Sequence, residues 1–498
     1  MDAVDVIVVG GGNAAVCAAL GAAEKGAKVI LLERSPQETR GGNSAFTGGA
    51  FRVVYDGVDD IRKMVPDLSQ AEIDGADFGT YTEEQYLDEW MALSQYRGDA
   101  DLIEMVVKRS LPAMLWLREQ GVRFVPLFGR QTFKVEGKLV FWGGLTVESS
   151  GGGLGLMQSL YRKAEKTPNI ELRYGTRAVG LRESDSDANS GGWVVECLVG
   201  RKKTEFAARN VILAAGGFHA NLEWRSKYLG KNWDLAKVRG SRYNTGDGIQ
   251  MGMDAGAIPH GNWTGCHAVF FDANAAPFGD ISMLDQQKNY FTNGIVVNAE
   301  GQRFIDEGEA FRNYNYSQMG ARVLAQPGGV AWQVFDQQTV DLLPGEYRVK
   351  HATRYQADTL EALADKMEGL SHEGKEGFLK TVREYNAAVR TDVKFNPAVL
   401  DGRSTPGLTP VKTNWANRLE KPPYVAYAVT CGITCTYGGL KVNTDAQVLD
   451  QEDRVIPGLY AAGEMVGGLY YIKYAGGAGL TAGSVLGRAA GNHAAGRR

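Results

Sequence analysis

The sequence has few cysteines, no long hydrophobic run and no strong excess of charge of one sign. Its five cysteines form an odd, scattered set, which argues against a disulfide framework and for a reducing compartment, the cytoplasm. No stretch reaches about 18 consecutive apolar residues, so we expect no transmembrane segment. The formal net charge is -4, which argues against nucleic acid or an anionic membrane as a partner bound through bulk charge.

Histidine is also scarce, with six residues in the chain. Cys266 and His267 are adjacent but have no second pair of ligands nearby, so we expect no metal site. Cys431 and Cys435 have neither the CxxC spacing nor the CxxCH spacing of c-type haem attachment. We therefore interpret these cysteines as small apolar core residues.

Glycine, in contrast, is abundant. The chain has 64 glycines in 498 residues, well above the usual share of about 7%. They cluster in short blocks between apolar runs and do not form a flexible repeat. The length fits two or three folding units, and 44% hydrophobic residues is ordinary for a globular protein.

The N-terminal segment has the order strand, turn, helix, strand. Residues 5–9, which are continuously apolar from Val6 onward, are predicted to be a buried parallel strand. Residues 14–25 are rich in alanine and precede Gly26, which favours a helix with a glycine at its C-terminal end. Residues 28–32 are predicted to form a second strand. The segment is therefore predicted to be a βαβ unit.

The glycine pattern Gly10-x-Gly12-x-x-Ala15 between this strand and helix predicts a dinucleotide site. Gly10 permits the tight turn, Gly12 lets a pyrophosphate approach the helix N-terminus, and Ala15 allows close helix packing. Glu33 ends the second strand, where an acid binds ribose hydroxyls. A turn without a ligand is the alternative, and the full βαβ context disfavours it. The motif alone does not separate FAD from NAD.

Later segments extend the pattern. Residues 41–49 are a glycine-rich loop, and residues 71–120 are predicted to be helical. Residues 169–208 are predicted to be a β-meander with a polar turn at 184–192. A further buried parallel strand is predicted at 210–215, closed by two glycines.

The pattern changes near residue 263, where aromatic and asparagine-rich loops and a helical stretch at 360–390 replace the glycine-flanked strands. The earlier pattern returns at residues 458–464, and residues 476–498 are predicted to be a helix of small residues. We therefore predict a nucleotide-binding domain in two parts, residues 1–262 and 403–498. A cap domain, residues 263–402, is inserted between them.

Three of these segments resemble FAD proteins of the glutathione-reductase type. Residues 211–217 resemble the strand-plus-glycine motif after the meander, and residues 458–464 resemble the C-terminal motif whose acid binds the ribityl chain. Residues 476–481 open a helix whose N-terminal amides would face the flavin N1–C2=O edge. The resemblance implies FAD and an α/β fold: a glutathione-reductase-type, Rossmann-like FAD-binding domain with an inserted α+β cap.

The residues expected to bind FAD come from these motifs and from the loops between them. Asp247 lies in a short loop after the meander that resembles a loop of the flavoprotein family described in the next paragraph, although aspartate is also a common turn residue. The expected set is Gly10, Gly12, Asn13, Ala14, Ala15, Glu33, Arg34, Gly42, Asn43, Ser44, Thr47, Gly48, Gly49, Ala178, Val179, Ala214, Ala215, Gly216, Asp247, Gly463, Glu464, Gly479, Leu480 and Thr481.

Over nearly its full length the chain resembles the fumarate reductase/succinate dehydrogenase flavoprotein family. Residues 40–44, Arg-Gly-Gly-Asn-Ser, resemble the loop of members that hold FAD without a covalent bond. Members of membrane complexes carry a flavin-linked histidine in this loop, and residues 33–52 contain none. The resemblance therefore implies non-covalent FAD.

The same resemblance implies two catalytic residues in the cap. Residues 301–307 resemble the run before the family's active-site arginine, and Arg312 falls at that position if one residue is inserted. In the family this arginine moves the proton that accompanies hydride transfer; binding a carboxylate is the alternative, because arginine normally stays protonated. Residues 263–267 resemble a segment ending in a substrate-binding histidine, here His267, with a purely structural histidine as the alternative.

Two positions depart from the family. Cys435 stands where fumarate reductases have a second histidine, and Tyr474 stands where they have a C-terminal arginine. Both departures argue against fumarate as the substrate. Tyr437, Tyr474 and the adjacent Lys473 are candidates to contact a carboxylate or polarise a carbonyl, or else to pack against the flavin face.

The resemblance implies an FAD-dependent dehydrogenase or reductase that acts on a C–C bond beside a carboxylate. Its partners would be a small carboxylic acid and an external electron donor or acceptor, since the sequence lacks haem and iron–sulfur motifs. Several alternatives stay open. The substrate could be a ketone bound by tyrosines, as in 3-ketosteroid dehydrogenases, or a specialised metabolite, or the enzyme could be fumarate reductase-like. The chain could instead be an electron-transfer subunit without substrate chemistry.

Overall fold

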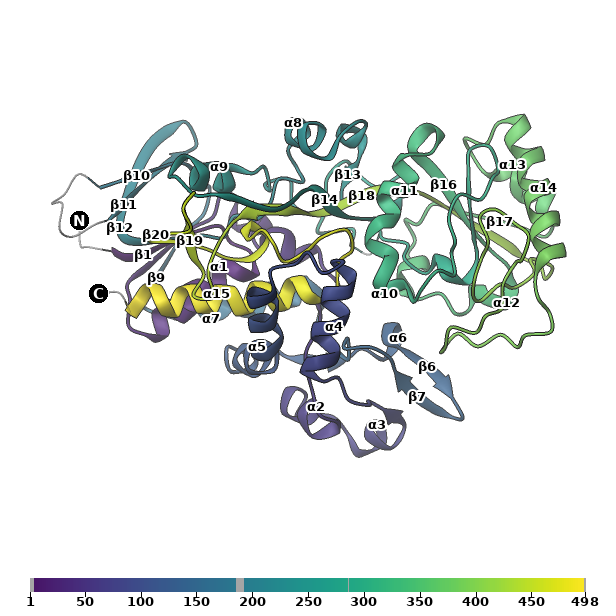
Figure 1. Cartoon of the computed structure of the whole chain (residues 1–498), viewed down its shortest axis with the longest axis horizontal. Coiled ribbons are helices and arrows are strands. Elements are labelled where there is room, and N and C mark those ends of the chain that lie inside the picture. Colours follow the sequence, from purple (N-terminus) through teal and green to yellow (C-terminus); the bar gives the residue numbers. More distant parts are fainter. Residues whose placement is uncertain (1–3, 185–191, 285, 497–498) are drawn as a thin grey trace. The chain divides into compact units, whose positions relative to one another are not determined.

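The computed structural model describes residues 4–184, 192–284 and 286–496 (Figure 1). The chain divides into two compact units. The first unit comprises residues 1–231, 240–266 and 435–498, and the second comprises residues 232–239 and 267–434. Two of the crossings between them fall within strands β14 (Pro259–Asp272) and β18 (Tyr424–Leu440).

The first unit is built on an eight-stranded sheet with the order β10-β11-β12-β1-β2-β9, in which β20 pairs with β12 and with β19. Its parallel core joins β12, β1, β2 and β9, and β10, β11 and β12 form the antiparallel meander predicted from the sequence. The strands are β1 (Val4–Val9), β2 (Val29–Leu32), β9 (Ile170–Arg173), β10 (Thr176–Glu183), β11 (Trp193–Val199), β12 (Lys202–Leu213), β19 (Gln447–Leu449) and β20 (Val455–Ala461).

The predicted βαβ unit is confirmed. β1 lies between β12 and β2, and its residues 6–9 are buried, which explains their unbroken apolar character. Helix α1 (Asn13–Glu24) follows at once and is buried over residues 13–23. Helix α15 (Ala478–Gly496) packs along α1, although the two are more than 450 residues apart in the sequence (Figure 1).

Helices α2 to α5 form a helical region over residues 58–119, in which α5 contacts α15. Two short three-stranded sheets accompany them, with the orders β3-β8-β5 and β4-β7-β6. The helices are α2 (Val58–Met64), α3 (Gln70–Asp74), α4 (Glu83–Leu93), α5 (Ala100–Glu119), α6 (Phe128–Gln131), α7 (Gly152–Glu165), α8 (Leu222–Trp224) and α9 (Asp247–Asp254). The short strands are β3 (Ala50–Phe51), β4 (Ala76–Asp77), β5 (Phe124–Pro126), β6 (Thr132–Val135), β7 (Lys138–Phe141) and β8 (Val147–Ser149).

The second unit contains most of a six-stranded sheet with the order β13-β18-β16-β15, in which β14 and β17 also pair with β18. Helices α13 and α14, in the stretch predicted to be helical, pack on it through Leu363 and Phe378 around Trp332. The remaining strands are β13 (Lys237–Val238), β15 (Ile295–Asn298), β16 (Val330–Phe335) and β17 (Arg354–Ala357). The helices are α10 (Arg312–Asn315), α11 (Met319–Leu324), α12 (Gln337–Val340), α13 (Leu360–Lys366) and α14 (His372–Ala388).

The second unit extends further along the chain than the predicted cap, which ended at residue 402. Ala416, Leu419 and Tyr424 belong to its hydrophobic core together with Trp332 and Phe378. The segment therefore packs with the second unit up to residue 434. Most of the turn predicted at residues 184–192 lies outside the described residues. Among the helices that the structure describes, none is long and apolar enough to cross a membrane.

The close packing of α15 on α1 generates a first prediction. A Cβ added at Gly491 would lie 2.1 Å from the carbonyl oxygen of Ala18, so Gly491→Ala must push the helices apart. We expect a loss of about 1–3 kcal/mol in the free energy of unfolding, because overpacking outweighs the gain in helix propensity. Thermal denaturation measures it.

The matched control is Gly496→Ala, at the end of the same helix, where an added Cβ meets nothing within 4 Å. Its melting temperature should stay at or above that of the wild type. Equal melting temperatures for Gly491→Ala and the wild type would contradict the close packing.

Candidate functional site

The turn between β1 and α1 is held tightly against two neighbours. A Cβ at Gly10, which has φ +120°, would lie 2.3 Å from the carbonyl oxygen of Ala214. A Cβ at Gly11 would lie 2.1 Å from a carboxylate oxygen of Glu33. The N-cap residue of α1, Gly12, contributes no side chain to the first turn. Such an uncapped helix N-terminus behind a glycine turn fits the pyrophosphate of a dinucleotide.

Glu33 lies buried beside this turn. One of its carboxylate oxygens accepts a hydrogen bond from the Ser35 amide at 2.6 Å. Burial raises the pKa of Glu33, and the hydrogen bonds of Ser35 and the charge of Arg34 oppose that shift. Ribose hydroxyls are donors that a buried carboxylate can accept, so the surroundings of Glu33 fit its predicted role.

The glycine-rich loop lies against the same helix end. It forms a 3-10 helix, η2 (Gly42–Phe46), and Ser44 Oγ accepts a hydrogen bond from the Asn13 amide at 3.0 Å. Thr47 Oγ1 donates to the Ser44 carbonyl and accepts from the Gly49 amide. A Cβ at Gly48 would lie 2.3 Å from Arg130 Nη1, so this arginine also approaches the loop.

Arg34 and Asp247 are paired with each other at 3.1 Å, and Asp247 also binds Arg177 at 2.8 Å. Asp247 therefore has a structural partner on β10 in addition to any contact with a cofactor. Ala178 and Val179 follow Arg177 on β10, where the ladder shifts register between Ala178 and Gly180. Val179 is exposed there.

The C-terminal motif meets the first one through Gly463, where an added Cβ would lie 2.7 Å from the Ala14 Cβ. Glu464 accepts a hydrogen bond from the Thr436 amide at 2.9 Å, and the same oxygen lies 3.1 Å from Nδ1 of His219. A Cβ at Gly217 would lie 2.2 Å from that oxygen, so the end of β12 and Glu464 are adjacent. His219 is fully buried, and it belongs to no motif that would identify it from the sequence.

Asn13 ties the start of α15 to α1. Its side-chain nitrogen, Nδ2, donates to the Leu480 carbonyl and to Ser484 Oγ, both at 2.9 Å. Thr481 Oγ1 donates to the Arg52 carbonyl at 2.8 Å. The amide of Gly479 donates to the hydroxyl of Tyr474 at 2.7 Å. Tyr474 therefore contacts the helix end that the resemblance places beside the flavin.

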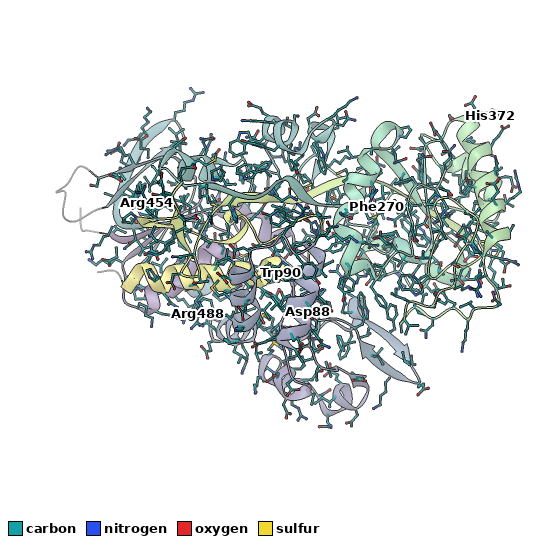
Figure 2. All side chains as sticks on the ribbon, viewed as in Figure 1. Asp88, Trp90, Phe270, His372, Arg454 and Arg488 are labelled. Atoms are coloured by element: carbon teal, nitrogen blue, oxygen red, sulfur yellow. The ribbon has the colours of Figure 1, made fainter. Side chains whose placement is uncertain are left out.

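Tyr437 and Tyr474 both pack against Tyr470, with ring centroids 5.7 and 4.9 Å away. The stack continues from Tyr470 to Trp90 on α4, labelled in Figure 2, at 5.4 Å. Tyr470 was not predicted from the sequence. Its hydroxyl is buried and makes no hydrogen bond among the described residues.

In the second unit, His267 is buried on β14 and contacts the Tyr316 ring edge-on at 5.0 Å. Burial, and secondly the charge of Arg239, lowers the pKa of His267 to about 3. The imidazole is therefore neutral at ordinary pH. A neutral imidazole offers one N–H donor to an anion and contributes no charge.

Arg312 begins α10, one helical turn before Tyr316. Its Nη2 donates to the hydroxyl of Tyr290 at 2.7 Å, and its guanidinium carbon lies 4.1 Å from the centroid of that ring. The hydrogen bond and the stacking together restrain the guanidinium plane. Tyr290 and Tyr316 were not predicted from the sequence, because neither belongs to a motif.

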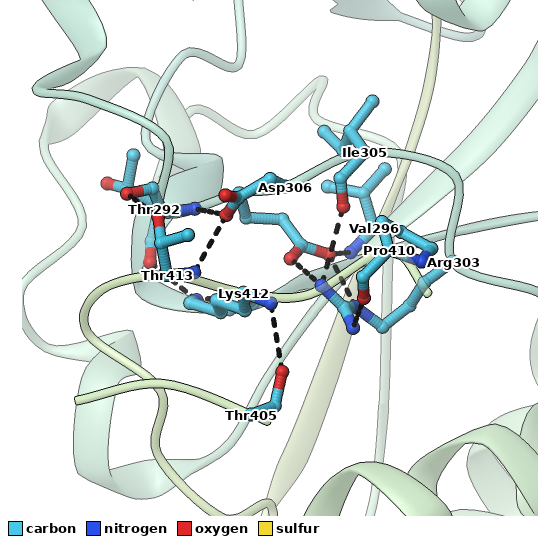
Figure 3. A network of polar contacts seen from close by, with 12 residues as sticks. Thr292, Val296, Arg303, Ile305, Asp306, Thr405, Pro410, Lys412 and Thr413 are labelled. Carbon is cyan, nitrogen blue, oxygen red and sulfur yellow. Dashed lines mark hydrogen bonds and ion pairs between the residues drawn. The ribbon is translucent and has the colours of Figure 1, made fainter. Parts of the chain in front are cut away.

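The loop before Arg312 is fixed by a buried polar network, shown in Figure 3. Arg303 and Glu307 form an ion pair at 2.5 Å, and Arg303 also donates to the Pro410 carbonyl. Asp306 accepts from the amides of Gly308 and Thr413 at 2.8 and 3.0 Å.

Lys412 completes this network. It donates to the carbonyls of Thr292 and Gly294 at 2.7 and 2.6 Å. Burial lowers the pKa of Lys412 to about 8, against the opposing charge of Glu307. The network fixes the backbone from which α10 starts.

Comparisons with known proteins agree with these observations. The chain matches the family described as FAD binding domain over residues 5–480. It is 29% identical to a probable fumarate reductase of Shewanella frigidimarina, over 98% of this chain and 74% of that protein. It is also 29% identical to the urocanate reductase of Eggerthella lenta, over 99% of this chain and 74% of that protein.

Among solved structures, the fold is similar to that of 3-ketosteroid Δ1-dehydrogenase from Sterolibacterium denitrificans. The TM-score is 0.74 at 22% sequence identity, and the match covers 100% of both chains.

The position of Glu33 generates a second prediction. Glu33→Gln keeps the size of the side chain but removes the charged acceptor, so we expect FAD affinity to fall roughly tenfold. Titration of the apoprotein with FAD, followed by flavin fluorescence, measures the dissociation constant. Glu38→Gln, an exposed site in the following loop, should bind FAD as the wild type does. Equal affinity in Glu33→Gln would rule out the ribose contact.

The buried His267 generates a prediction about pH. Its pKa is about 3 in the folded chain and near 6.5 in the unfolded chain, so below pH 6.5 the unfolded state binds a proton that the folded state does not. Its contribution to the free energy of unfolding is therefore lost as pH falls, by about 1 kcal/mol between pH 6.5 and 5.5. Urea unfolding of wild type and His267→Gln at both pH values should reveal a steeper decline in the wild type.

The control for this experiment is His372→Gln at the exposed start of α14, where His372 is labelled in Figure 2. Its difference from the wild type should not change between the two pH values. A constant difference for His267→Gln as well would mean that His267 has the same pKa in the folded and unfolded chains, which would contradict its burial as a neutral imidazole.

Proposed function

Since the chain belongs to the FAD binding domain family and is an FAD-dependent oxidoreductase, we propose that it moves a hydride between flavin N5 and a C–C bond beside a substrate carboxylate. The observation that carries this proposal is the group formed by His267, Tyr316, Arg312 and Tyr290 in the second unit. It combines a restrained guanidinium with a neutral imidazole. This combination binds a carboxylate and leaves a proton donor or acceptor beside it.

The chemistry requires such a group. Oxidation of a C–C bond next to a carboxylate removes a proton from the α-carbon, and the resulting negative charge is high in energy unless the carboxylate is neutralised. Arg312 is partly exposed and supplies positive charge. His267 supplies a hydrogen bond without charge. Tyr290 accepts a hydrogen bond from Arg312 and so fixes which guanidinium nitrogens face the substrate.

Arg312 has two possible roles in this scheme. As a carboxylate clamp it stays protonated throughout, which is the ordinary state of arginine. As a proton carrier it passes one of its protons to the substrate in the reductive direction and recovers it afterwards. Its hydrogen bond to the Tyr290 hydroxyl supports the second role, because a phenol hydroxyl can both donate and accept a proton beside the guanidinium.

For the substrate we propose tricarballylate, oxidised to cis-aconitate. The segment Gly432-Ile433-Thr434-Cys435-Thr436-Tyr437 and the tyrosine at 474 resemble tricarballylate dehydrogenase. The names of two relatives, a fumarate reductase and a urocanate reductase, refer to substrates with a C=C bond conjugated to a carboxylate. Both observations support a carboxylate-bearing substrate. A cytoplasmic location and an external electron partner are part of the same proposal.

A second candidate is a desaturase or ene-reductase of a ketone. It is favoured by the cluster of Tyr437, Tyr470 and Tyr474, whose hydroxyls could polarise a carbonyl. The fold shared with 3-ketosteroid Δ1-dehydrogenase supports it.

The test is anaerobic mixing of the purified yellow protein with tricarballylate, succinate and a 3-ketosteroid in turn. We expect tricarballylate to bleach the flavin absorption band. We expect Arg312→Ala to slow bleaching by at least about 100-fold with unchanged flavin content, because the positive charge next to the reacting carbon is lost. Tyr290→Phe keeps the ring and should give a smaller loss. Stopped-flow absorbance measures each rate.

Arg322→Ala is the matched control, an exposed arginine on α11 of the same unit. It should bleach at the wild-type rate. Bleaching by the ketone alone would replace this proposal with the second candidate. Bleaching by none of the three compounds would favour an electron-transfer subunit.

A further inference from the structure

One oxygen of the Glu464 carboxylate is surrounded by donors from two other segments of the first unit. Oε1 accepts from the Thr436 amide at 2.9 Å and from the Thr436 hydroxyl at 3.3 Å. The same oxygen lies 3.1 Å from Nδ1 of His219. A carboxylate accepts hydrogen bonds and does not donate them, so Nδ1 carries the hydrogen and donates it to Oε1.

The donors around this oxygen are themselves fixed. Thr436 Oγ1 accepts from the Phe218 amide at 3.2 Å, which ties residue 436 to the segment after β12. A Cβ added at Gly217 would lie 2.2 Å from both Glu464 Oε1 and Thr436 Oγ1, so the backbone before His219 also closes around Oε1. Three contacts therefore occupy Oε1. Oε2 makes no hydrogen bond among the described residues, and the Glu464 side chain is 16% exposed.

The second ring nitrogen of His219 is unsatisfied. The ring is fully buried, and Nε2 makes no hydrogen bond among the residues that the structure describes. An unsatisfied polar atom in the interior is destabilising, and a leucine would fill such a space without one. Packing alone therefore does not explain a histidine at this position, whereas its hydrogen bond to Glu464 does.

We propose that His219 is a positioning residue for FAD: its Nδ1–H holds Oε1 of Glu464 and leaves Oε2 to accept from a hydroxyl of the flavin's ribityl chain. The proposal rests on the predicted contact of Glu464 with the ribityl chain, and it makes no assumption about the substrate. Without the imidazole, Glu464 keeps Thr436 as a partner but gains rotamer freedom. Ordering the carboxylate when FAD binds then becomes less favourable.

The test compares two substitutions of similar size. His219→Asn keeps an N–H donor near the position of Nδ1 and removes Nε2, whereas His219→Leu removes both nitrogens. Titration of each apoprotein with FAD, followed by flavin fluorescence, gives the dissociation constant. We expect His219→Leu to weaken FAD binding by about 5- to 20-fold, because a hydrogen bond to a charged group is lost. His219→Asn should stay within about twofold of the wild type, because it keeps the donor.

The melting temperatures of the same apoproteins separate positioning from packing. Leucine fills a buried space at least as favourably as asparagine, so the His219→Leu apoprotein should melt no lower than the His219→Asn apoprotein. The order of stability is then the reverse of the order of FAD affinity. Equal weakening of FAD binding in both variants would mean that the filled space matters and the donor does not, and would overturn the proposal.

A double-mutant cycle with Glu464→Gln shows whether His219 acts through the carboxylate. In the Glu464→Gln background the charged acceptor is gone, so His219→Leu and His219→Asn should bind FAD within about twofold of each other. An undiminished difference between the two variants in this background would show that His219 acts independently of Glu464, and the proposal would be wrong.

His493→Leu is the matched control. His493 is a half-buried histidine near the end of α15, and its Nδ1 lies 3.0 Å from the Tyr460 hydroxyl. This variant should bind FAD as the wild type does. If His219→Leu does not fold, His219→Met, which also lacks the donor, takes its place.

Two failures can be told apart. If Glu464→Gln binds FAD as tightly as the wild type, the contact of Glu464 with the ribityl chain is wrong, and the role of His219 is wrong with it. If Glu464→Gln weakens FAD binding but His219→Leu does not, the contact stands and only the role of His219 is wrong. Neither result bears on the proposed carboxylate substrate, which bleaching of the flavin tests separately.

Discussion

The close packing of glycines and alanines around the N-terminal turn and α1 is the constraint on which the rest of the first unit depends. At Gly10, Gly463 and Gly491 an added Cβ would lie within 3 Å of Ala214, Ala14 and Ala18 respectively. These three contacts bring the end of β12, the C-terminal motif and α15 against the N-terminal turn and α1, from which each lies more than 200 residues away in the sequence. The small side chains are therefore a requirement of assembly, since larger ones would separate the segments that surround the dinucleotide turn.

The sequence predicts the first unit well because its signals are local. The apolar run of β1, the glycine turn, the alanine-rich helix and the meander each occur within a few dozen residues, and all four are present. The second unit is harder to predict from the sequence, because its sheet is assembled around β18, whose partners β14, β16 and β17 come from far earlier in the chain. β18 itself is interrupted by glycines, cysteines and threonines, so neither its length nor the end of the unit at residue 434 is visible in a periodic pattern.

The candidate site follows the same division. Motifs point to Arg312 and His267, but the residues that hold them, Tyr290 and Tyr316, come from contacts that no local pattern encodes. The same is true of His219 beside Glu464 and of Tyr470 between the two predicted tyrosines. A motif records the residues that touch a ligand in many proteins. The side chains that orient those residues vary with the packing of each chain, so they require a structure.

Charge in the second unit is distributed according to burial. Arg303 and Lys412 lie in the interior, and each is compensated: Arg303 by Glu307, Lys412 by two carbonyls and the nearby charge of Glu307. Burying these cations without compensation would cost several kcal/mol. Their contacts with Glu307 and the carbonyls offset this cost and fix the loop. Arg312 and Arg239 are partly exposed; among their contacts, Arg312 donates to the hydroxyl of Tyr290, and Arg239 donates to Gln287 and Thr434. The unit therefore uses its buried cations to fix the loop before Arg312, while burial keeps His267, which packs on Tyr316 one helical turn after Arg312, neutral.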